Sequence, residues 1–269
     1  MLKGNSKFQI ELIKGSNGYL IKKSSQDNPK RLLNQAMKQH LFHHLIPKNA
    51  IIDSYFETPE VLSKGKDYFV MDFYNGKSIL DIFEKGDITI LDEIVTKLFW
   101  FIKWETFKCT KDKVNEILID KLNSLPTNPI IDNCIDYINK NTIIIPIGLC
   151  HGDLTLSNVI FSNKIVLIDF LDSYLESPLQ DITKLLQESN LKWSLLMDNS
   201  KRDNTKIEIS YDYLKSKINQ KIEEKFKEYI PSIKLIYIIT LLRILPYTDD
   251  NKISDIINKE IEKIAKELE

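Results

Sequence analysis

The chain has 269 residues, of which 43% are hydrophobic, and its formal net charge is −1. This length and apolar content are sufficient to bury the core of one large domain or of two smaller lobes. The near-neutral charge excludes the strongly basic surface that nucleic-acid-binding proteins use, so we expect no nucleic acid as a partner.

Cysteine usage and the apolar pattern predict a cytoplasmic protein. The three cysteines, Cys109, Cys134 and Cys150, are widely separated, which predicts neither a disulfide framework nor a zinc site. The first residues do not resemble a signal peptide, and we expect no apolar run long enough to span a membrane. No membrane partner is therefore expected, and the oligomeric state is left open.

The first third of the chain predicts a small antiparallel sheet with one helix. Residues 8–13 and 19–23 are two predicted strands, joined by a turn that contains two glycines. Pro29 fits the first turn of a helix that ends at about residue 45. Two further strands are predicted over residues 51–56 and 67–73.

The rest of the chain is mostly helical by its apolar periodicity. A predicted hairpin is the exception, with strands over residues 159–161 and 165–168 around a Ser-Asn-Lys turn. Predicted helices cover residues 79–85, 91–107, 115–125, 130–139, 211–229, 233–245 and about 253–268, and a further helix begins within about ten residues of Asp169.

The most informative segment is residues 149–158, Leu-Cys-His-Gly-Asp-Leu-Thr-Leu-Ser-Asn, followed by Ile-Asp-Phe at residues 168–170. It sets Asp153, Asn158 and Asp169 in a fixed order beside apolar strands. Phosphoryl transfer from a nucleotide uses one carboxylate to orient the attacking hydroxyl, and an amide and a second carboxylate to hold Mg²⁺. We interpret Asp153 as the catalytic group and Asn158 and Asp169 as metal ligands, with ATP and Mg²⁺ as cofactors.

At these residues the chain resembles the aminoglycoside phosphotransferase and choline kinase superfamily, the small-molecule branch of the protein-kinase-like fold. The pattern His-Gly-Asp-Leu-x-x-x-Asn plus Ile-Asp-Phe carries the resemblance. It extends to Asp181, which by that resemblance braces the catalytic loop, and His151 is expected to brace the same loop. Gly152 stands where protein kinases usually carry Arg, and no Ala-Pro-Glu segment follows Asp169, which argues against a protein kinase.

The resemblance implies an α+β, bilobal, protein-kinase-like fold. We expect an N-terminal nucleotide-binding lobe over residues 1–73, built on a small antiparallel sheet. Residues 74–269 are expected to form the mostly helical C-terminal lobe, which carries the catalytic and substrate-binding residues. Coverage extends over most of the chain, although the N-terminal third matches only loosely.

In this family a strand lysine pairs with the nucleotide phosphates. Lys22 and Lys23 are both candidates, and the expected strand register favours Lys22. The following helix should offer a Glu to that lysine, but residues 28–45 contain no acidic residue. Gln35 lies where the Glu is expected and would accept a weaker hydrogen bond from an ammonium group.

Two further segments are expected to touch the nucleotide. Gly4, Asn5 and Ser6 would form a short loop over the phosphates, although a single glycine is a weak signal. The segment that contains Asp72 and Tyr74 is interpreted as the hinge between the lobes, whose backbone would bind the adenine edge.

The acceptor is expected to bind between the catalytic loop and the helices of the large lobe. Asp172, Tyr174 and Glu176 follow the metal strand and are candidate pocket residues. Arg243 stands in an apolar run, where a structural salt bridge competes with a role as an anchor for an anionic or polyhydroxyl substrate.

The resemblance implies an ATP-dependent phosphotransferase that acts on a hydroxyl group of a small molecule, and we favour a sugar or another polyol. A choline- or ethanolamine-type kinase and an aminoglycoside kinase are the alternatives within this class. A catalytically silent kinase-like binding module is the alternative outside it, favoured by the missing helix Glu and opposed by the intact Asp153, Asn158 and Asp169.

Overall fold

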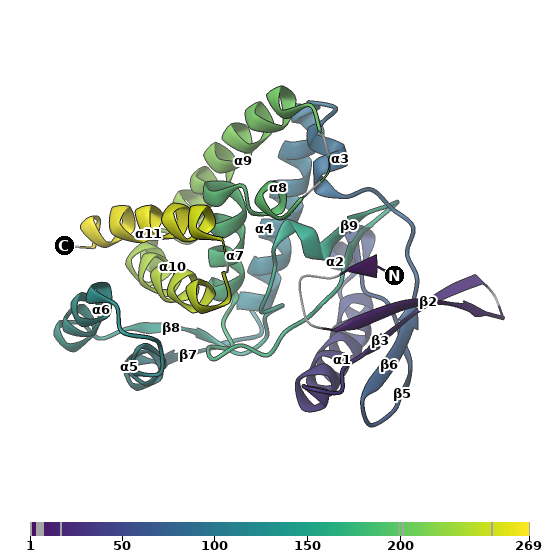
Figure 1. Cartoon of the computed structure of the whole chain (residues 1–269), viewed down its shortest axis with the longest axis horizontal. Helices are drawn as coiled ribbons and strands as arrows, with labels where there is room; N and C mark the ends of the chain where they lie inside the picture. Colours follow the sequence, from purple (N-terminus) through teal and green to yellow (C-terminus); the bar gives the residue numbers. More distant parts are fainter. Residues whose placement is uncertain are drawn as a thin grey trace. The chain divides into compact units, whose positions relative to one another are not determined.

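The computed structural model describes two compact units (Figure 1). The first contains residues 1–79 and 157–172, and the second contains residues 80–156 and 173–269. The predicted division at residue 73 assigns the returning segment to the second lobe, whereas in the structure it packs with the first unit. The structure describes residues 2–3, 8–16, 18–198, 200, 202–248 and 250–268.

The main sheet of the first unit is built around the predicted hairpin. β2 (Gln9–Gly15) pairs antiparallel with β3 (Gly18–Ser24). Gly18 has a φ of +142°, a backbone conformation that L side chains rarely adopt, and it closes the turn. The sheet is completed by β1 (Leu2–Lys3), β5 (Val61–Lys64) and β6 (Tyr68–Asp72), in the order β1-β2-β3-β6-β5.

Helix α1 (Pro29–Leu45) packs against this sheet, and it has the predicted bounds. Pro29 occupies its first turn, where the missing backbone N–H has no helical partner to lose. Leu32 and Ala36 of the helix join the buried cluster of the sheet, to which Phe8 and Phe69 also belong. This apolar contact fixes the helix on the sheet, mainly over β6 and β5.

Residues 50–55 form a helix, α2 (Ala50–Tyr55), so the strand predicted over residues 51–56 is wrong. Asn49 explains the difference, because its Oδ1 accepts hydrogen bonds from the backbone N–H groups of Ile51 and Ile52, both at 3.1 Å. This helix cap outweighs the strand preference of the β-branched residues that follow. The strand that pairs with β6 is instead β5, which lies outside the predicted segment.

A second sheet brings residues 157–172 into the first unit. β9 (Val159–Phe161) and β10 (Ile165–Leu167) form the predicted antiparallel hairpin, and β10 also pairs in parallel with β4 (Phe56–Glu57). Gly76 packs against the hairpin, and a Cβ atom at this position would lie 2.5 Å from Ile160 Cγ2 and 2.7 Å from the carbonyl oxygen of Phe161. Only glycine fits there without a shift of the backbone.

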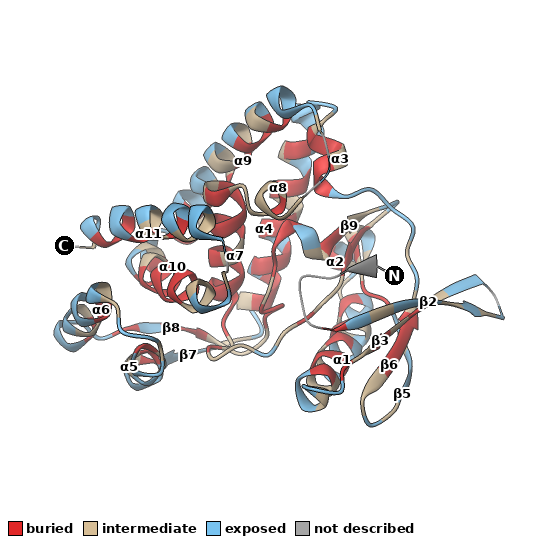
Figure 2. Ribbon diagram, in the orientation of Figure 1, coloured by how far each residue is buried: buried red, intermediate tan, exposed pale blue. Residues whose placement is uncertain are grey.

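The second unit is mostly helical, as predicted. α7 and α10 are the helices at its core, and Figure 2 shows both largely in the colour of buried residues. A two-stranded sheet that we did not predict consists of β7 (Thr110–Lys113) and β8 (Ile144–Ile147). The helices are α3 (Ile79–Phe83), α4 (Ile88–Thr106), α5 (Asn115–Asn123), α6 (Pro129–Lys140), α7 (Pro178–Leu191), α8 (Trp193–Met197), α9 (Asn204–Lys225), α10 (Ile230–Ile244) and α11 (Asn251–Lys266). Single 3₁₀ turns cover Ile46–Lys48, Leu156–Asn158, Lys227–Tyr229 and Leu245–Tyr247.

The segment Lys227–Tyr247, which contains α10, corrects one expectation. It is helical over 21 residues and is long and apolar enough to cross a membrane by length and composition. Within its apolar window, 61% of the residues are buried inside the protein. A core helix of a soluble protein passes the same test, so the segment is weak evidence for a membrane span.

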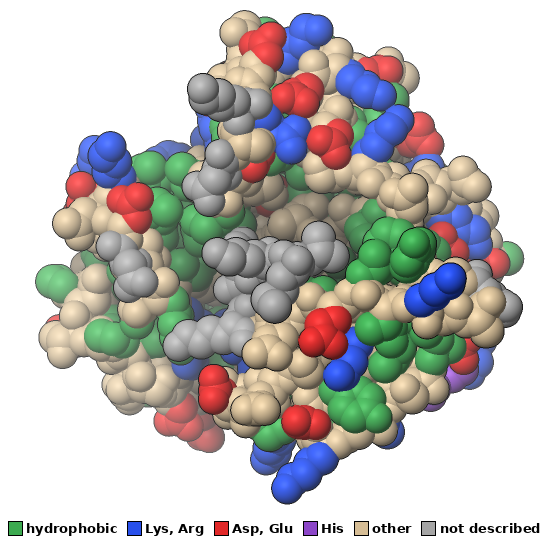
Figure 3. Space-filling view, turned by 45° about the vertical axis from the view of Figure 1, so that its right-hand side comes forward, with side chains coloured by type: hydrophobic (Ala, Val, Ile, Leu, Met, Phe, Trp, Pro, Cys, Tyr) green, Lys and Arg blue, Asp and Glu red, His purple; other side chains and the backbone are tan. Residues whose placement is uncertain are grey.

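Charges of both signs are interspersed on the surface. On the face drawn in Figure 3, Lys and Arg side chains alternate with Asp and Glu side chains, in keeping with the net charge of −1. Arg202 illustrates the pairing, because its guanidinium group lies 3.1 Å from Asp81, 3.1 Å from Glu84 and 2.5 Å from Asp198. A half-buried arginine of the second unit thus contacts three carboxylates.

Candidate active site

The hairpin β9–β10 places both predicted metal ligands at one end. Leu167 pairs with Val159 in the ladder, and the backbone N–H of Ile168 donates to the carbonyl oxygen of Asn158 at 3.1 Å. Asn158 directly precedes one strand, and Asp169 lies just beyond the other. Antiparallel pairing therefore brings an amide and a carboxylate to the same end of the hairpin, within the first unit.

The backbone of Asp169 adopts a left-handed conformation with a φ of +60°. For a residue with a Cβ atom this costs about 1 kcal/mol or more, although Asp tolerates it better than most. The chain turns sharply there, and β10 has already ended at Leu167. Strained residues of this kind cluster at functional sites, which agrees with the position of Asp169 in the motif.

Lys23 forms a buried ion pair with this carboxylate. Its Nζ lies 2.7 Å from Asp169 Oδ1, and its side chain is only 1% exposed. The ammonium group also lies 4.9 Å from the centre of the Phe8 ring, a cation–π contact. Since a buried charge is costly without a partner, the pair with Asp169 offsets the cost of burying the Lys23 ammonium group.

Lys22 occupies the opposite face of the strand, which corrects the predicted register. Its side chain is 36% exposed, and its Nζ lies 3.6 Å from Glu11 Oε2 on the neighbouring strand. Successive side chains of a strand point to opposite faces, so only one of two adjacent lysines can reach the hairpin end. The structure places Lys23, and not the predicted Lys22, beside Asp169.

Gln35 lies in α1, as predicted, but its described contacts do not include the lysine. Its side chain is buried, and its Oε1 has no hydrogen-bond partner among the described residues. Gln39, about one turn later, donates to the carbonyl oxygen of Pro59 at 3.0 Å. Asp169 therefore pairs with the strand lysine in place of a helix Glu.

The predicted phosphate loop, Gly4, Asn5 and Ser6, lies outside the described residues.

The predicted hinge residues are engaged within the first unit. Asp72 Oδ2 accepts a hydrogen bond from the backbone N–H of Glu60 at 3.3 Å. The Tyr74 hydroxyl donates to Glu57 Oε2 at 3.5 Å. Burial, together with the charge of Glu57, raises the pKa of Tyr74 to about 12. Both side chains thus have partners, and contact between the hinge backbone and a nucleotide stays a prediction.

In the second unit, α7 holds the loop that carries Asp153. Asp181 is fully buried, and its two oxygens accept the backbone N–H groups of His151 at 2.6 Å and of Gly152 at 2.7 Å. His151 Nδ1 accepts the backbone N–H of Asp153 at 3.2 Å. Gly152 has a φ of +87°, which favours glycine. Asp181 and His151 therefore both fix the loop backbone, and neither is placed as a base.

Two more side chains of α7 hold the same loop, and neither was predicted from the sequence. Lys184 Nζ lies 3.0 Å from Asp153 Oδ1, with only 13% of the Lys184 side chain exposed. The fully buried Glu188 accepts the backbone N–H of Leu156 at 3.2 Å. Asp181, Lys184 and Glu188 are spaced by three and four residues, so they lie on one face of the helix. Charged residues at this spacing in an apolar helix were the signal available in the sequence.

Removal of the Glu188 carboxylate should destabilise the fold. Besides Leu156, its oxygens accept Ser194 N at 2.9 Å, Ser194 Oγ at 2.8 Å and the Tyr211 hydroxyl at 2.8 Å. Glu188→Ala leaves these buried donors without an acceptor, so we expect the free energy of unfolding to fall by about 2–4 kcal/mol. Urea denaturation measures this, with Glu262→Ala on the exposed face of α11 as control. Equal midpoints for the two variants would contradict the bracing role.

The predicted substrate residues are divided between the units. Asp172 is exposed and belongs to the first unit. Glu176, in the second unit, accepts the backbone N–H of Ser173 at 2.6 Å and the Cys150 thiol at 3.4 Å, so its carboxylate holds the loop in which it lies. Tyr174 and Arg243 lie together in the second unit, with the guanidinium carbon 4.8 Å from the ring centre.

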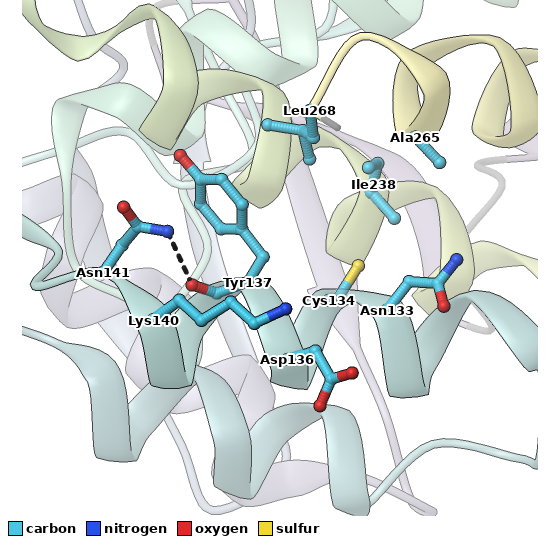
Figure 4. Close-up of a pocket in the computed structure, with 9 residues that line it drawn as sticks. All are labelled: Asn133, Cys134, Asp136, Tyr137, Lys140, Asn141, Ile238, Ala265 and Leu268. Carbon is cyan, nitrogen blue, oxygen red and sulfur yellow. Dashed lines mark hydrogen bonds between the residues drawn. The ribbon is translucent and has the colours of Figure 1, made fainter.

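A separate pocket of about 400 Å³ lies between α6, α10 and α11 (Figure 4). Cys134, Tyr137 and Lys140 line it from α6, Ile238 from α10 and Ala265 from α11. Burial raises the pKa of the Cys134 thiol to about 11, so the thiol stays protonated and unreactive. None of the residues predicted to bind nucleotide, metal or substrate lines this pocket.

Residues 140–202 match the model of the phosphotransferase enzyme family. This segment contains the loop that carries Asp153, the hairpin β9–β10 and the whole of α7. No curated protein matches the chain. The family match therefore coincides with the part of the chain in which the candidate site residues are concentrated.

Several solved structures share the fold. A protein from Thermobifida fusca assigned as a fructosamine-3-kinase has a TM-score of 0.58 at 10% identity, with 98% of this chain and 91% of that chain covered. A glucosamine kinase in complex with glucosamine, ADP and inorganic phosphate has a TM-score of 0.57 at 8% identity, with coverage of 97% and 82%. The gentamicin complex of APH(2″)-IIa has a TM-score of 0.51 at 17% identity, with coverage of 95% and 90%. The predicted α+β, protein-kinase-like fold and the predicted resemblance are confirmed.

Proposed function

We propose that this protein is an ATP- and Mg²⁺-dependent kinase that phosphorylates a hydroxyl group of a small molecule. The buried ion pair between Lys23 and Asp169 carries the proposal, because it sets a cation and an anion at the hairpin end that Asn158 shares. The family match to residues 140–202 and the ADP bound in a structure of the same fold support a nucleotide as the phosphoryl donor. A location in the cytoplasm, where ATP is available, is part of the proposal.

Asn158 and Asp169 fit Mg²⁺ by their chemistry. They offer one neutral and one charged oxygen, and Mg²⁺ takes one or two carboxylates and completes its octahedral shell with waters and phosphate oxygens. Among the described residues there is no group of three or more His, Cys, Asp or Glu that could hold a metal alone, which agrees with a shell completed by a nucleotide. When bound, the metal would neutralise charge on the phosphate oxygens. Lys23, which replaces Lys22 in the proposal, would add a second positive charge to the phosphates.

Asp153 is proposed to receive the proton of the acceptor. The acceptor hydroxyl donates a hydrogen bond to the carboxylate and transfers its proton as the new O–P bond forms. The bond from the γ-phosphorus to the bridging oxygen breaks, and ADP leaves with that electron pair. Lys184 holds the carboxylate in place from α7, while Asp181 holds the backbone on the N-terminal side of Asp153. Positioning of this kind supplies most of the catalysis in phosphoryl transfer.

The acceptor is proposed to be a sugar or another polyol, with aminoglycosides and choline- or ethanolamine-type amines as alternatives. The bound glucosamine in one structure of the same fold and the gentamicin in another support a polyhydroxyl acceptor. A silent nucleotide-binding module is the second candidate, favoured by Gln35 in the place of the helix Glu. Transfer of phosphate from ATP to any hydroxyl in a panel of metabolites separates an enzyme from such a module.

Substitution of Asp169 tests the metal site. Asp169→Asn keeps a hydrogen-bond acceptor for Lys23 and removes the charged metal ligand. Calorimetric titration with ATP, in Mg²⁺ and in EDTA, should show that the metal strengthens binding to the parent protein. In the variant, the factor by which Mg²⁺ strengthens ATP binding should be at least about tenfold smaller, because a charged metal ligand has been removed. The exposed Asp27→Asn in the same unit is the control. Equal affinity of the parent protein in Mg²⁺ and EDTA would contradict the assignment.

A further inference from the structure

Two cations lie near the ring of Tyr174 in the second unit. The guanidinium carbon of Arg243, on α10, is 4.8 Å from the centre of the Tyr174 ring. The ammonium group of Lys121, on α5, is 6.0 Å from the same ring centre. Two helices that are far apart in the sequence thus direct positive charge at one aromatic side chain of the loop after the metal strand.

Neither cation has a counter-ion in the described part of the chain. Arg243 and Lys121 make no ion pair with any described carboxylate, whereas Arg202 is surrounded by three. Both side chains are half-buried, so water screens them only partly. The pKa of Lys121 is lowered, first by burial and then by the charge of Arg243. The two charges therefore disfavour each other, and an anion placed beside them would relieve that cost.

The neighbouring loop residues Ser173 and Tyr174 carry buried hydroxyl groups. The oxygens of Tyr174 and Ser173 are buried and have no hydrogen-bond partner among the described residues. Burial raises the pKa of Tyr174 far above its usual value, so the hydroxyl stays protonated and remains a donor. An unsatisfied buried hydroxyl costs about 1–3 kcal/mol, and an acceptor atom from a ligand would remove that cost.

The loop that carries these groups is tied to the catalytic loop of the same unit. The backbone N–H of Gly148 donates to the carbonyl oxygen of Glu176 at 2.8 Å. The Cys150 thiol donates to Glu176 Oε2 at 3.4 Å, and Cys150 directly precedes His151. These hydrogen bonds thus link the loop of Tyr174 to the segment that leads into Asp153.

We propose that Lys121, Arg243 and the hydroxyl of Tyr174 form a subsite for an anionic group, a carboxylate or a phosphate, on the acceptor molecule. This inference rests on the proposed kinase function and narrows its substrate to a polyol that carries a negative charge, such as a sugar acid or a sugar phosphate. Arg and Lys bind both anions through charge-assisted hydrogen bonds. The same two cations repel a cationic acceptor, so amines such as choline, ethanolamine and aminoglycosides are disfavoured.

Calorimetric binding with saturating Mg·ADP present tests the subsite without turnover. The probes are gluconate for the carboxylate, glucose 6-phosphate for the phosphate, glucose as the neutral analogue and inorganic phosphate as the free anion. At least one of the two charged sugars should bind about tenfold or more tightly than glucose, as expected for a charge-assisted contact in a half-buried site. If inorganic phosphate binds and neither charged sugar does, the proposal of an acceptor subsite is overturned.

Three variants and one control complete the test. Arg243→Gln and Lys121→Gln should each remove most of the preference for the charged sugar, and Tyr174→Phe should weaken it by a smaller factor. Lys234→Gln is the matched control, because Lys234 also lies on α10 but pairs with Glu267 at 2.9 Å. The subsite is overturned if charged and neutral sugars bind equally or if neither binds. It is also overturned if the preference for the charged sugar persists in both Arg243→Gln and Lys121→Gln. Mg·ATP binding in the same samples separates this failure from a failure of the kinase proposal.

Discussion

Asp153→Asn should lower kcat by roughly 10²–10⁴-fold and leave the affinity for ATP nearly unchanged. The substitution keeps the shape of the side chain and removes the group proposed to take the acceptor proton. The loop around it should stay in place, because Asp181 holds the backbone N–H groups of His151 and Gly152. Steady-state kinetics with an identified acceptor at saturating Mg·ATP measures the effect.

Asp255→Asn is the control for this experiment, since Asp255 is exposed on α11 in the same unit. Its kcat should equal that of the parent protein. Parental turnover by Asp153→Asn would contradict the role of this carboxylate, even if the protein is a kinase. A large rise in the KM for ATP with kcat unchanged would instead assign Asp153 to nucleotide binding.

Lys23→Met should raise the KM for ATP or lower kcat by at least about tenfold, because a charge proposed to contact the phosphates is lost. Met keeps most of the apolar stem that packs in the buried position of Lys23, so the fold should tolerate the change. ATP titration and steady-state kinetics measure both parameters.

Lys22→Met is the matched control for Lys23→Met, one residue away on the other face of β3. Lys22 is 36% exposed and pairs with Glu11 at 3.6 Å, and surface pairs of this kind contribute little. Its kinetics should differ from those of the parent protein by less than about twofold, as for a surface substitution. A larger kinetic effect of Lys22→Met than of Lys23→Met would instead support the predicted Lys22 and exclude Lys23 from the site.

The loop that carries Asp153 and the hairpin were predictable because their sequence signals are local. The motif from His151 to Asn158 and the strand before Asp169 are close in sequence, and a short turn joins the two strands. The fold class followed from the same motif through the resemblance, and the structures of the same fold confirm it.

Features that depend on long-range contacts could not be predicted from the sequence. The choice between Lys22 and Lys23 depends on which face of β3 meets the hairpin, and the hairpin is more than 130 residues away in the chain. The pair of Lys184 with Asp153 needs the loop to fold back on α7.

The strand predicted over residues 51–56 failed for a local reason, because the side chain of Asn49 caps a helix there.

The most direct test of the central proposal is transfer of the labelled γ-phosphate of ATP to acceptors. The panel contains glucose, gluconate, glucose 6-phosphate, glucosamine, choline, ethanolamine and an aminoglycoside, and the parent protein is compared with Asp153→Asn. We expect Mg²⁺-dependent transfer to at least one hydroxyl by the parent protein, with transfer by Asp153→Asn reduced roughly 10²–10⁴-fold. Binding of Mg·ATP by the parent protein without transfer to any hydroxyl or amine would contradict it.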